Sequence, residues 1–202
     1  MHPAKAFHVE DRARLLAFLA EHSFVTLCAS VAGRPFAAHA PVVVRDLGDD
    51  GLFLDFHLSR MNAVASAVVT GFSAVAIAMG PHAYVSPDWY GADDQVPTWN
   101  YVSVEAEGFV TPLSEAETIV LLDDLSAQEE ARLLPKPVWT RDKMTPAKFD
   151  ALLRGIVGAR LHVERLEGTF KLGQNKREAE RAGVIEALGD HPVAAWMREI
   201  TP

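Results

Sequence analysis

The chain has 202 residues, of which 49% are hydrophobic and 23% are charged. A chain of this length and balance buries a core without a disulfide or a structural metal, so its composition excludes a disordered chain, a collagen and a coiled-coil rod. Its 19 basic and 27 acidic residues give a net charge of −8. Phosphate backbones repel such a chain, and direct DNA binding is therefore doubtful unless a local basic patch exists.

Cysteine content and hydropathy indicate the compartment. The single cysteine, Cys28, cannot form an intrachain disulfide, which is typical of a reducing environment. The N-terminus is charged rather than apolar, and polar residues and glycine interrupt the longest weakly polar stretch, 63–81. That stretch lacks the roughly 20 strongly apolar residues that a membrane span requires. We expect a soluble, cytoplasmic protein with no membrane segment.

Helix and strand signals alternate in the first half of the chain. Asp11 precedes a helical pattern, and β-rich runs separated by turn residues follow it. The expected elements are a helix from 11 to near 22, strands at 24–30, 36–44 and 52–58, a short helix at 60–69, strands at 74–79 and 83–86, a loop at 86–97, and a long strand at 98–111 with Gly108 as a candidate bulge.

The second half is richer in helix. Ser114 and Glu117 resemble a capping box at the start of a helix. The expected elements are helices at 114–132 and 145–153, a strand at 158–166, a helix at 175–188 and a last short helix from Pro192. Together these elements predict an α+β fold, a six- or seven-stranded antiparallel barrel wrapped by helices. We expect a single domain over 1–202, with a helical insertion at about 114–154 and a C-terminal helical segment at about 175–202.

A first candidate site lies at 57–62, between an expected strand and an expected helix. Ser59 is placed to cap that helix, whose free N–H groups would face a bound anion. Arg60 adds a guanidinium fork suited to phosphate. The alternative is a capped helix with a solvated arginine and a strand-end histidine, His57.

Aromatic residues mark a second candidate site. The loop at 80–90 carries tyrosines and a tryptophan, which suit a planar ring system or a subunit contact. In the next strand Trp99 and Tyr101 project to one face, and Asn100 projects to the other. The Asn100 amide can donate and accept at the edge of a flavin or pterin. The alternatives are a loop folded back onto the barrel and half-buried barrel aromatics.

A polar segment at 171–176 is a further candidate. Asn175 would serve there as a helix N-cap, whereas capping does not explain Lys171, Gln174 or Lys176. Other site classes have no motif to support them. The eight histidines show no metal-binding spacing, and the glycine-rich nucleotide motifs and the GxSxG nucleophile motif are absent from the sequence.

The candidate segments together resemble the PaiB family, described as FMN-binding negative transcriptional regulators on the FMN-binding split barrel. Four motifs occur here in the family's order: Met1-x-Pro3-x-x-Phe7, Gly80-Pro81-x-Ala83-Tyr84-x-Ser86-Pro87-x-Trp89-Tyr90, Val96-Pro97-Thr98-Trp99-Asn100-Tyr101 and Lys171-Leu172-x-Gln174-Asn175-Lys176. The sequence departs from the family pattern after Asn62, where Pro-Gln-Trp is replaced by Ala63-Val64-Ala65, and at Gly173, where the family has serine.

The resemblance implies a homodimer with FMN at the subunit interface and its phosphate near Ser59 and Arg60. Trp99 with Tyr101 or Tyr84 would flank the ring, and His57 or His82 could relay protons. The residues expected to bind FMN are His57, Ser59, Arg60, Asn62, Tyr84, Trp99, Asn100, Tyr101, Lys171, Gln174 and Asn175. No catalytic residue and no metal ligand is assigned.

Three functions remain open at this point. The first is a flavin-binding regulator of gene expression, as the resemblance implies. The second is an FMN-dependent oxidoreductase acting on a small substrate, in which the isoalloxazine carries the hydride chemistry. The third is a binding protein that kept the fold and lost the cofactor, which the altered segment after Asn62 favours.

Overall fold

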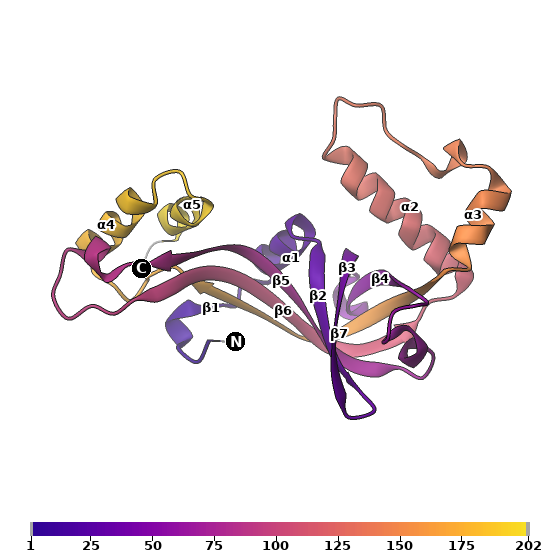
Figure 1. Cartoon of the computed structure of the whole chain (residues 1–202), viewed down its shortest axis with the longest axis horizontal. Helices are drawn as coiled ribbons and strands as arrows, with labels where there is room; N and C mark the ends of the chain where they lie inside the picture. The colour runs from indigo at the N-terminus through magenta and orange to yellow at the C-terminus, as the bar shows by residue number, and fades with distance from the viewer. Residues whose placement is uncertain (1, 201–202) are drawn as a thin grey trace. The chain divides into compact units, whose positions relative to one another are not determined.

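The computed structural model describes residues 2–200 and has the mixed α+β architecture that the sequence predicts (Figure 1). The strands are β1 (His8–Val9), β2 (Phe24–Val31), β3 (Arg34–Asp46), β4 (Leu52–Ser59), β5 (Phe72–Val85), β6 (Thr98–Pro112) and β7 (Ile156–Lys171). The α-helices are α1 (Arg12–Glu21), α2 (Glu115–Ala131), α3 (Pro146–Leu153), α4 (Glu178–Leu188) and α5 (Pro192–Glu199). Short 3₁₀ turns are η1 (Lys5–Phe7), η2 (Gly48–Asp50), η3 (Ala65–Val69), η4 (Pro87–Tyr90) and η5 (Arg141–Lys143).

The seven strands form one sheet in the order β1-β7-β4-β3-β2-β5-β6, and β7 also pairs with β6. Neighbouring strands such as β2–β3, β3–β4 and β4–β7 run antiparallel. The β2–β3 hairpin is closed by Ala32 and Gly33, both at positive φ, which is the geometry that fits the right-handed twist of the two strands. The fold is the predicted antiparallel split barrel.

Two expectations for the first half differ from the structure. The predicted strands at 74–79 and 83–86 do form, but as one continuous strand, β5, because Gly80 and Pro81 only shift its alternation: Ala78 and Ala83 are both buried. The predicted helix at 60–69 does not form. Residues 60–64 form turns, and only Ala65–Val69 form a short 3₁₀ helix, η3. Local hydrogen bonds from Ser59 and Asn62 compete with the helix there.

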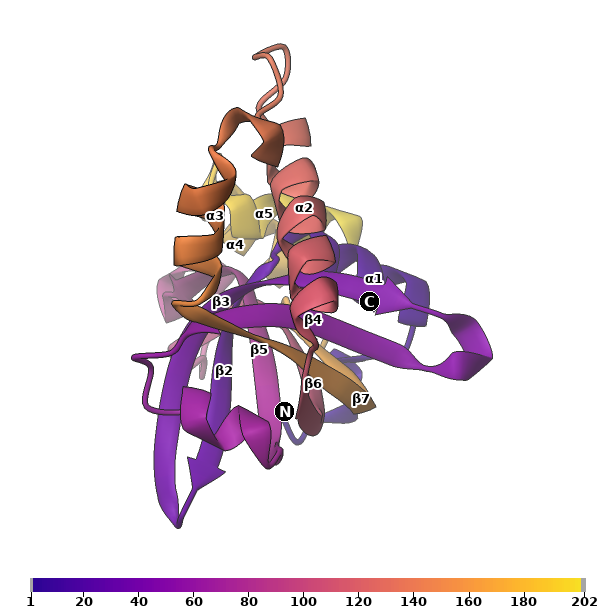
Figure 2. The ribbon, with the colours of Figure 1, turned by 90° about the vertical axis from the view of Figure 1, so that its right-hand side faces the viewer.

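The chain divides into two compact units, each with its own buried side chains. Among the described residues, one comprises 2–15, 79–105 and 167–200, and it buries Phe7, Phe170 and Met197. The other comprises 16–78 and 106–166, and it buries Leu54 and Leu161. Within the second unit α2 and α3 lie side by side (Figures 1 and 2).

Helix α2 begins and docks as its sequence dictates. The Glu117 amide donates to Ser114 Oγ at 3.2 Å, and the Ser114 amide donates to Glu117 Oε2 at 2.8 Å, which confirms the capping box. The buried face of α2 packs Leu121 and Leu125 against Val43 of β3. This packing fixes the helix over the sheet and beside the end of β4.

Gly108 allows close approach of two strands. A Cβ atom at this position would lie 1.8 Å from the carbonyl oxygen of His162 in β7. Leu113 N donates to Gly158 O at 3.0 Å further along the same pair of strands. Glycine is therefore required here by the approach of a neighbouring backbone.

Candidate functional site

The predicted phosphate-binding segment lies where β4 ends, in the unit of 16–78 and 106–166. The chain turns twice after Ser59. Ser59 Oγ accepts from the Met61 amide at 3.2 Å, and Asn62 Oδ1 accepts from the Val64 amide at 3.0 Å. Ser59 therefore caps a turn instead of the helix expected from the sequence.

This difference changes which groups can bind an anion. The amides of Arg60 and Asn62 donate to Gly155 O and Ser59 O, both at 2.9 Å, and the Met61 amide is held by Ser59 Oγ. The free N–H groups of a helix N-terminus, expected here from the sequence, are thus already occupied. Any anion bound at this turn has to rely on side chains.

Arg60 provides such a side chain. Arg60 is exposed, and its Nε donates to the carbonyl oxygen of Arg154 at 3.0 Å. Arg154 lies just beyond the end of α3. This anchor restrains the guanidinium plane, whose remaining N–H groups can form a bidentate contact with phosphate. Ser59 is exposed beside it and adds a hydroxyl.

His57 lies two residues before this turn and lines a half-open pocket. It lines a cavity of about 300 Å³ beneath α2 and α3, together with Leu122, Phe149 and Ile156. Its Nδ1 is buried and has no hydrogen-bond partner within residues 2–200. Burial lowers the pKa of His57 below its ordinary value of 6.5, so the ring is neutral near pH 7. A neutral imidazole with a free nitrogen can bind or relay a proton.

The predicted ring-binding aromatics lie in the other unit, on the neighbouring strands β5 and β6. Trp99 is 52% exposed and Tyr84 is 48% exposed, and their ring centroids are 6.3 Å apart in an edge-to-face arrangement. His82 lies 5.7 Å from the Trp99 ring. Large exposed aromatic side chains that contact one another form a surface suited to a planar ligand or a subunit contact.

The neighbouring β6 residues alternate as the sequence predicts. Trp99 is exposed, Asn100 is buried at 2% exposure, and Tyr101 is half-buried. Asn100 Nδ2 donates to Met197 Sδ of α5 at 3.4 Å, so its amide contacts the interior of its own unit. Burial, followed by the charge of Glu105, raises the pKa of Tyr101.

The polar segment after β7 is organised around one glutamine. Gln174 Oε1 accepts from the Leu172 amide at 2.8 Å, and its Nε2 donates to Phe170 O at 2.5 Å. Lys171 donates to Thr98 Oγ1, and burial, then the charge of Lys176, lowers the pKa of Lys171. Asn175 is exposed and is not the expected N-cap, because α4 begins at Glu178 with Arg177 as its cap.

The predicted site residues thus form two groups, one in each unit. His57, Ser59, Arg60 and Asn62 lie together at the end of β4, and the remaining seven lie at β5, β6 and the end of β7. The structure adds residues that sequence analysis missed, Trp139, Met144 and Phe149, which line the cavity reached by His57. A tryptophan in a proline-rich connection is the one sequence signal that could have indicated them. No group of three His, Cys, Asp or Glu side chains within 2–200 is arranged to hold a metal ion.

Comparison with known proteins identifies the class. Residues 1–165 match the family model described as "Putative FMN-binding domain", and the chain belongs to this family. A named relative is "Protease synthase and sporulation protein PAI 2" of Bacillus subtilis, which is 31% identical over 99% of this chain and 96% of that protein. The match confirms the resemblance to the PaiB family.

Solved structures support the fold. The "FAD and Heme binding protein" of Mycobacterium smegmatis matches with a TM-score of 0.60 at 17% identity, over 91% of this chain and 80% of that one. The "Flavocytochrome Anf3" of Azotobacter vinelandii matches with a TM-score of 0.58 at 14% identity, over 90% and 78%. At these identities the likeness concerns the fold alone.

Proposed function

We propose that this chain is an FMN-binding protein that holds the FMN phosphate at the turn of 59–62. The observation that carries the proposal is the exposed, anchored guanidinium of Arg60, with the Ser59 hydroxyl beside it. A guanidinium fork restrained at Nε retains donors in the geometry that phosphate prefers. In this proposal Asn62 shapes the turn through its bond to Val64, and His57 supplies a neutral imidazole behind it.

We propose, separately from the phosphate turn, that the exposed aromatics of the other unit form a surface for a flavin ring. Trp99 and Tyr84 offer ring faces for stacking, and the half-buried Tyr101 lies on the same face of β6 as Trp99. Lys171 and Asn175 are further polar contacts in this proposal. Asn100 and Gln174 have amides bound within the chain, which supports a positioning role for both.

A flavin-dependent oxidoreductase is a second candidate function. FMN, when bound, supplies hydride or electron transfer through its ring. His82 favours this candidate because it is exposed and contacts Trp99, where it could deliver a proton to a substrate beside the ring. Reduction of the bound flavin by NADH or NADPH and reoxidation by an added acceptor would support the enzyme; a flavin that never cycles would exclude it.

The assembly and location are also proposals. We propose a cytoplasmic homodimer, which is supported by the exposed aromatic surface and by the single unpaired cysteine. Among residues 2–200 no helix combines the length and the apolar character needed to cross a bilayer.

A regulatory role through direct DNA contact has little electrostatic support, given a net charge of −8. We expect no retention of DNA fragments at low salt, with or without FMN. Retention that falls linearly with the logarithm of salt concentration would contradict this expectation.

The experiment that tests FMN binding at this turn compares two arginine variants. FMN affinity is measured by flavin fluorescence for the wild type, Arg60→Ala and Arg34→Ala, whose arginine lies in the exposed β2–β3 hairpin. The proposal requires a loss of affinity in Arg60→Ala alone. Equal affinities in all three proteins would place the phosphate elsewhere.

A further inference from the structure

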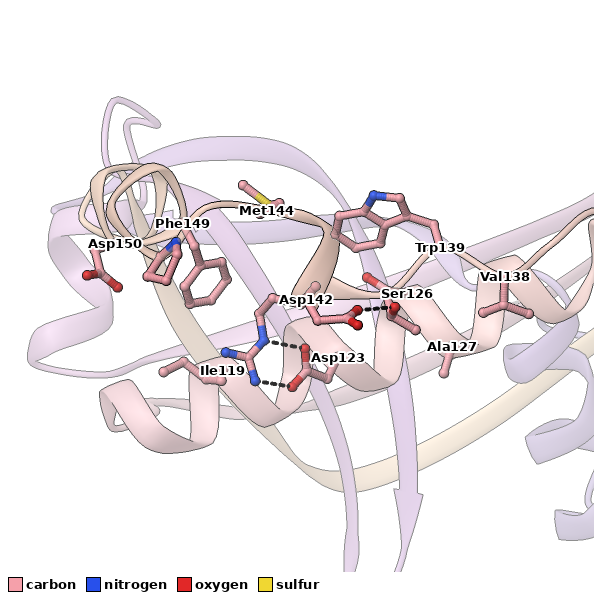
Figure 3. Close-up of a pocket in the computed structure, with 13 residues that line it drawn as sticks. Ile119, Asp123, Ser126, Ala127, Val138, Trp139, Asp142, Met144, Phe149 and Asp150 are labelled. Atoms are coloured by element: carbon pink, nitrogen blue, oxygen red, sulfur yellow. Dashed lines mark hydrogen bonds and ion pairs between the residues drawn. The ribbon is translucent and has the colours of Figure 1, made fainter.

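A cleft between α2 and α3 is not explained by FMN binding. We call it the α2–α3 cleft. Its outer part has a volume of about 570 Å³, and its inner part is the cavity of about 300 Å³ that reaches His57. Figure 3 shows the residues that line the outer part. Small-molecule sites typically have volumes of roughly 300–1,000 Å³. The two parts share six lining residues: Asp123, Ser126, Trp139, Arg141, Met144 and Phe149.

The walls of the outer cleft are largely apolar and aromatic. Trp139 comes from the connection between the helices, Phe149 from α3, and Ile119 from α2. Trp139 and Phe149 are only half-buried, so each keeps ring surface that a ligand can cover. Such walls suit a ligand with an apolar or aromatic body.

The one arginine that lines the described cleft is already engaged. Arg141 binds the Asp123 carboxylate with two hydrogen bonds, Nε–Oδ1 at 2.8 Å and Nη2–Oδ2 at 2.9 Å (Figure 3). Its guanidinium also lies 4.9 Å from the centre of the Phe149 ring. An anionic ligand would have to displace Asp123, so the cleft is poorly suited to a carboxylate or a phosphate.

Two further carboxylates, Asp142 and Asp150, line the cleft, and neither forms an ion pair within residues 2–200. The ammonium group of Lys143 lies close by, where it donates to the Val138 carbonyl oxygen at 2.7 Å. The Asp142 carboxylate accepts a hydrogen bond from the Thr140 hydroxyl. Acidic groups beside aromatic ring faces form the environment that attracts an organic cation.

We propose that the α2–α3 cleft binds a small organic amine, with its ammonium group at Asp142 and its apolar body against Trp139 and Phe149. The ligand class is a protonated amine with one apolar or aromatic substituent. The proposal does not depend on FMN binding, because the residues that carry it lie in the α2–α3 segment and none of them belongs to the phosphate turn.

The first test compares three probes of similar size that differ in charge. Isothermal titration calorimetry of the full chain is carried out with 2-phenylethylamine, 2-phenylethanol and 3-phenylpropanoate. Because a charge-assisted hydrogen bond adds roughly tenfold or more in affinity, the amine should bind about tenfold more tightly than the alcohol, and the carboxylate should bind least. Equal affinities of amine and alcohol, preference for the carboxylate, or no amine binding at millimolar concentration would overturn the proposal.

The second test locates the bound amine with three variants. Asp142→Asn should reduce amine affinity about tenfold while leaving alcohol affinity unchanged. Ala127→Trp places a large ring in the cleft from the exposed side of α2 and should abolish binding of both probes. Asp49→Asn removes an exposed charge in η2 and serves as the control. Unchanged amine binding in either of the first two variants would place the amine outside the cleft.

Discussion

Arg160 of β7 binds the carboxylate of Asp55 in β4 with two parallel hydrogen bonds, Nε–Oδ1 at 2.7 Å and Nη2–Oδ2 at 2.9 Å. Asp55 is only 1% exposed, and Arg45 of β3 donates to the same carboxylate at 2.5 Å. Arg45 also donates to Asp124 of α2 at 2.7 Å. The hydrogen bond to Asp55 raises the pKa of Arg160. This network of ion pairs joins β3, β4 and β7 to α2, the helix that forms one wall of the α2–α3 cleft.

Removing the Asp55 charge should therefore destabilise the fold. Asp55→Asn leaves two partly buried guanidinium groups without their shared carboxylate, and we expect the free energy of unfolding to fall by about 3–5 kcal/mol. Urea denaturation measures this change. The control is Glu107→Gln, which breaks the exposed pair with Arg165 and should cost about 1 kcal/mol or less. Similar losses in both variants would mean that the buried network contributes nothing beyond a surface pair.

Gly108→Ala tests the close approach of β6 and β7. The new Cβ would lie 1.8 Å from the His162 carbonyl oxygen, so the two backbones have to separate, and we expect a loss of at least about 3 kcal/mol of stability. Gly155→Ala is the matched control, because its Cβ would lie 3.2 Å from Leu152 O. Thermal unfolding of both variants gives the comparison. A Gly108→Ala midpoint equal to that of the control would contradict the close approach of β6 to the His162 carbonyl.

The burial of His57 predicts that the free energy of unfolding depends on pH. Because burial lowers its pKa in the folded state, the unfolded chain takes up a proton first as the pH falls below about 6.5. The free energy of unfolding should therefore decrease below that pH and level off below the folded-state pKa. Urea denaturation at several pH values between 8 and 5, for the wild type and His57→Gln, isolates this contribution.

The control for this effect is His39→Gln, which removes an exposed histidine of β3. We expect its stability to follow the wild-type pH profile, whereas the profile of His57→Gln should be flatter between the two pKa values of the imidazole. A His57→Gln profile that parallels the wild type would show that His57 does not titrate differently on folding.

Helix starts and strand runs could be predicted because local chemistry decides them. Ser114 with Glu117, and Pro146 with Pro192, mark helix starts that the structure reproduces. Two predictions failed. Pro81 does not end β5, because a strand can accommodate it with a shift of alternation. The helix at 60–69 does not form because local bonds to Ser59 and Asn62 compete with it, and because long-range bonds hold the amide and Nε of Arg60 at Gly155 and Arg154.

The candidate site was predictable only in part for the same reason. Exposed aromatics such as Trp99 follow from strand alternation, and Arg60 follows from its neighbours in sequence. The cleft depends on side chains from α2, the connection and α3, such as Asp123, Arg141 and Phe149. Nothing in their spacing along the chain brings them together, because the packing of α2 against α3 does so.

Removing the Arg60 guanidinium should weaken the binding of FMN. In Arg60→Ala the phosphate loses a charge-assisted hydrogen bond, and we expect FMN binding to weaken by about 1.5–3 kcal/mol. Arg60→Lys keeps the charge but loses the planar fork, so its loss should be intermediate. Fluorescence titration with FMN measures both. A lysine variant that binds FMN no more tightly than the alanine variant would indicate that Arg60 acts through its planar fork and not through its charge alone.

The most direct test of the account is the absorbance spectrum of the purified full chain, before and after incubation with FMN and desalting. We predict that the desalted protein retains the flavin bands near roughly 370 and 450 nm. Arg60→Ala, treated in the same way, should retain less. A wild-type protein that stays colourless after incubation with FMN would contradict the assignment of FMN to this chain and would favour a cofactor-free binding protein on the same fold.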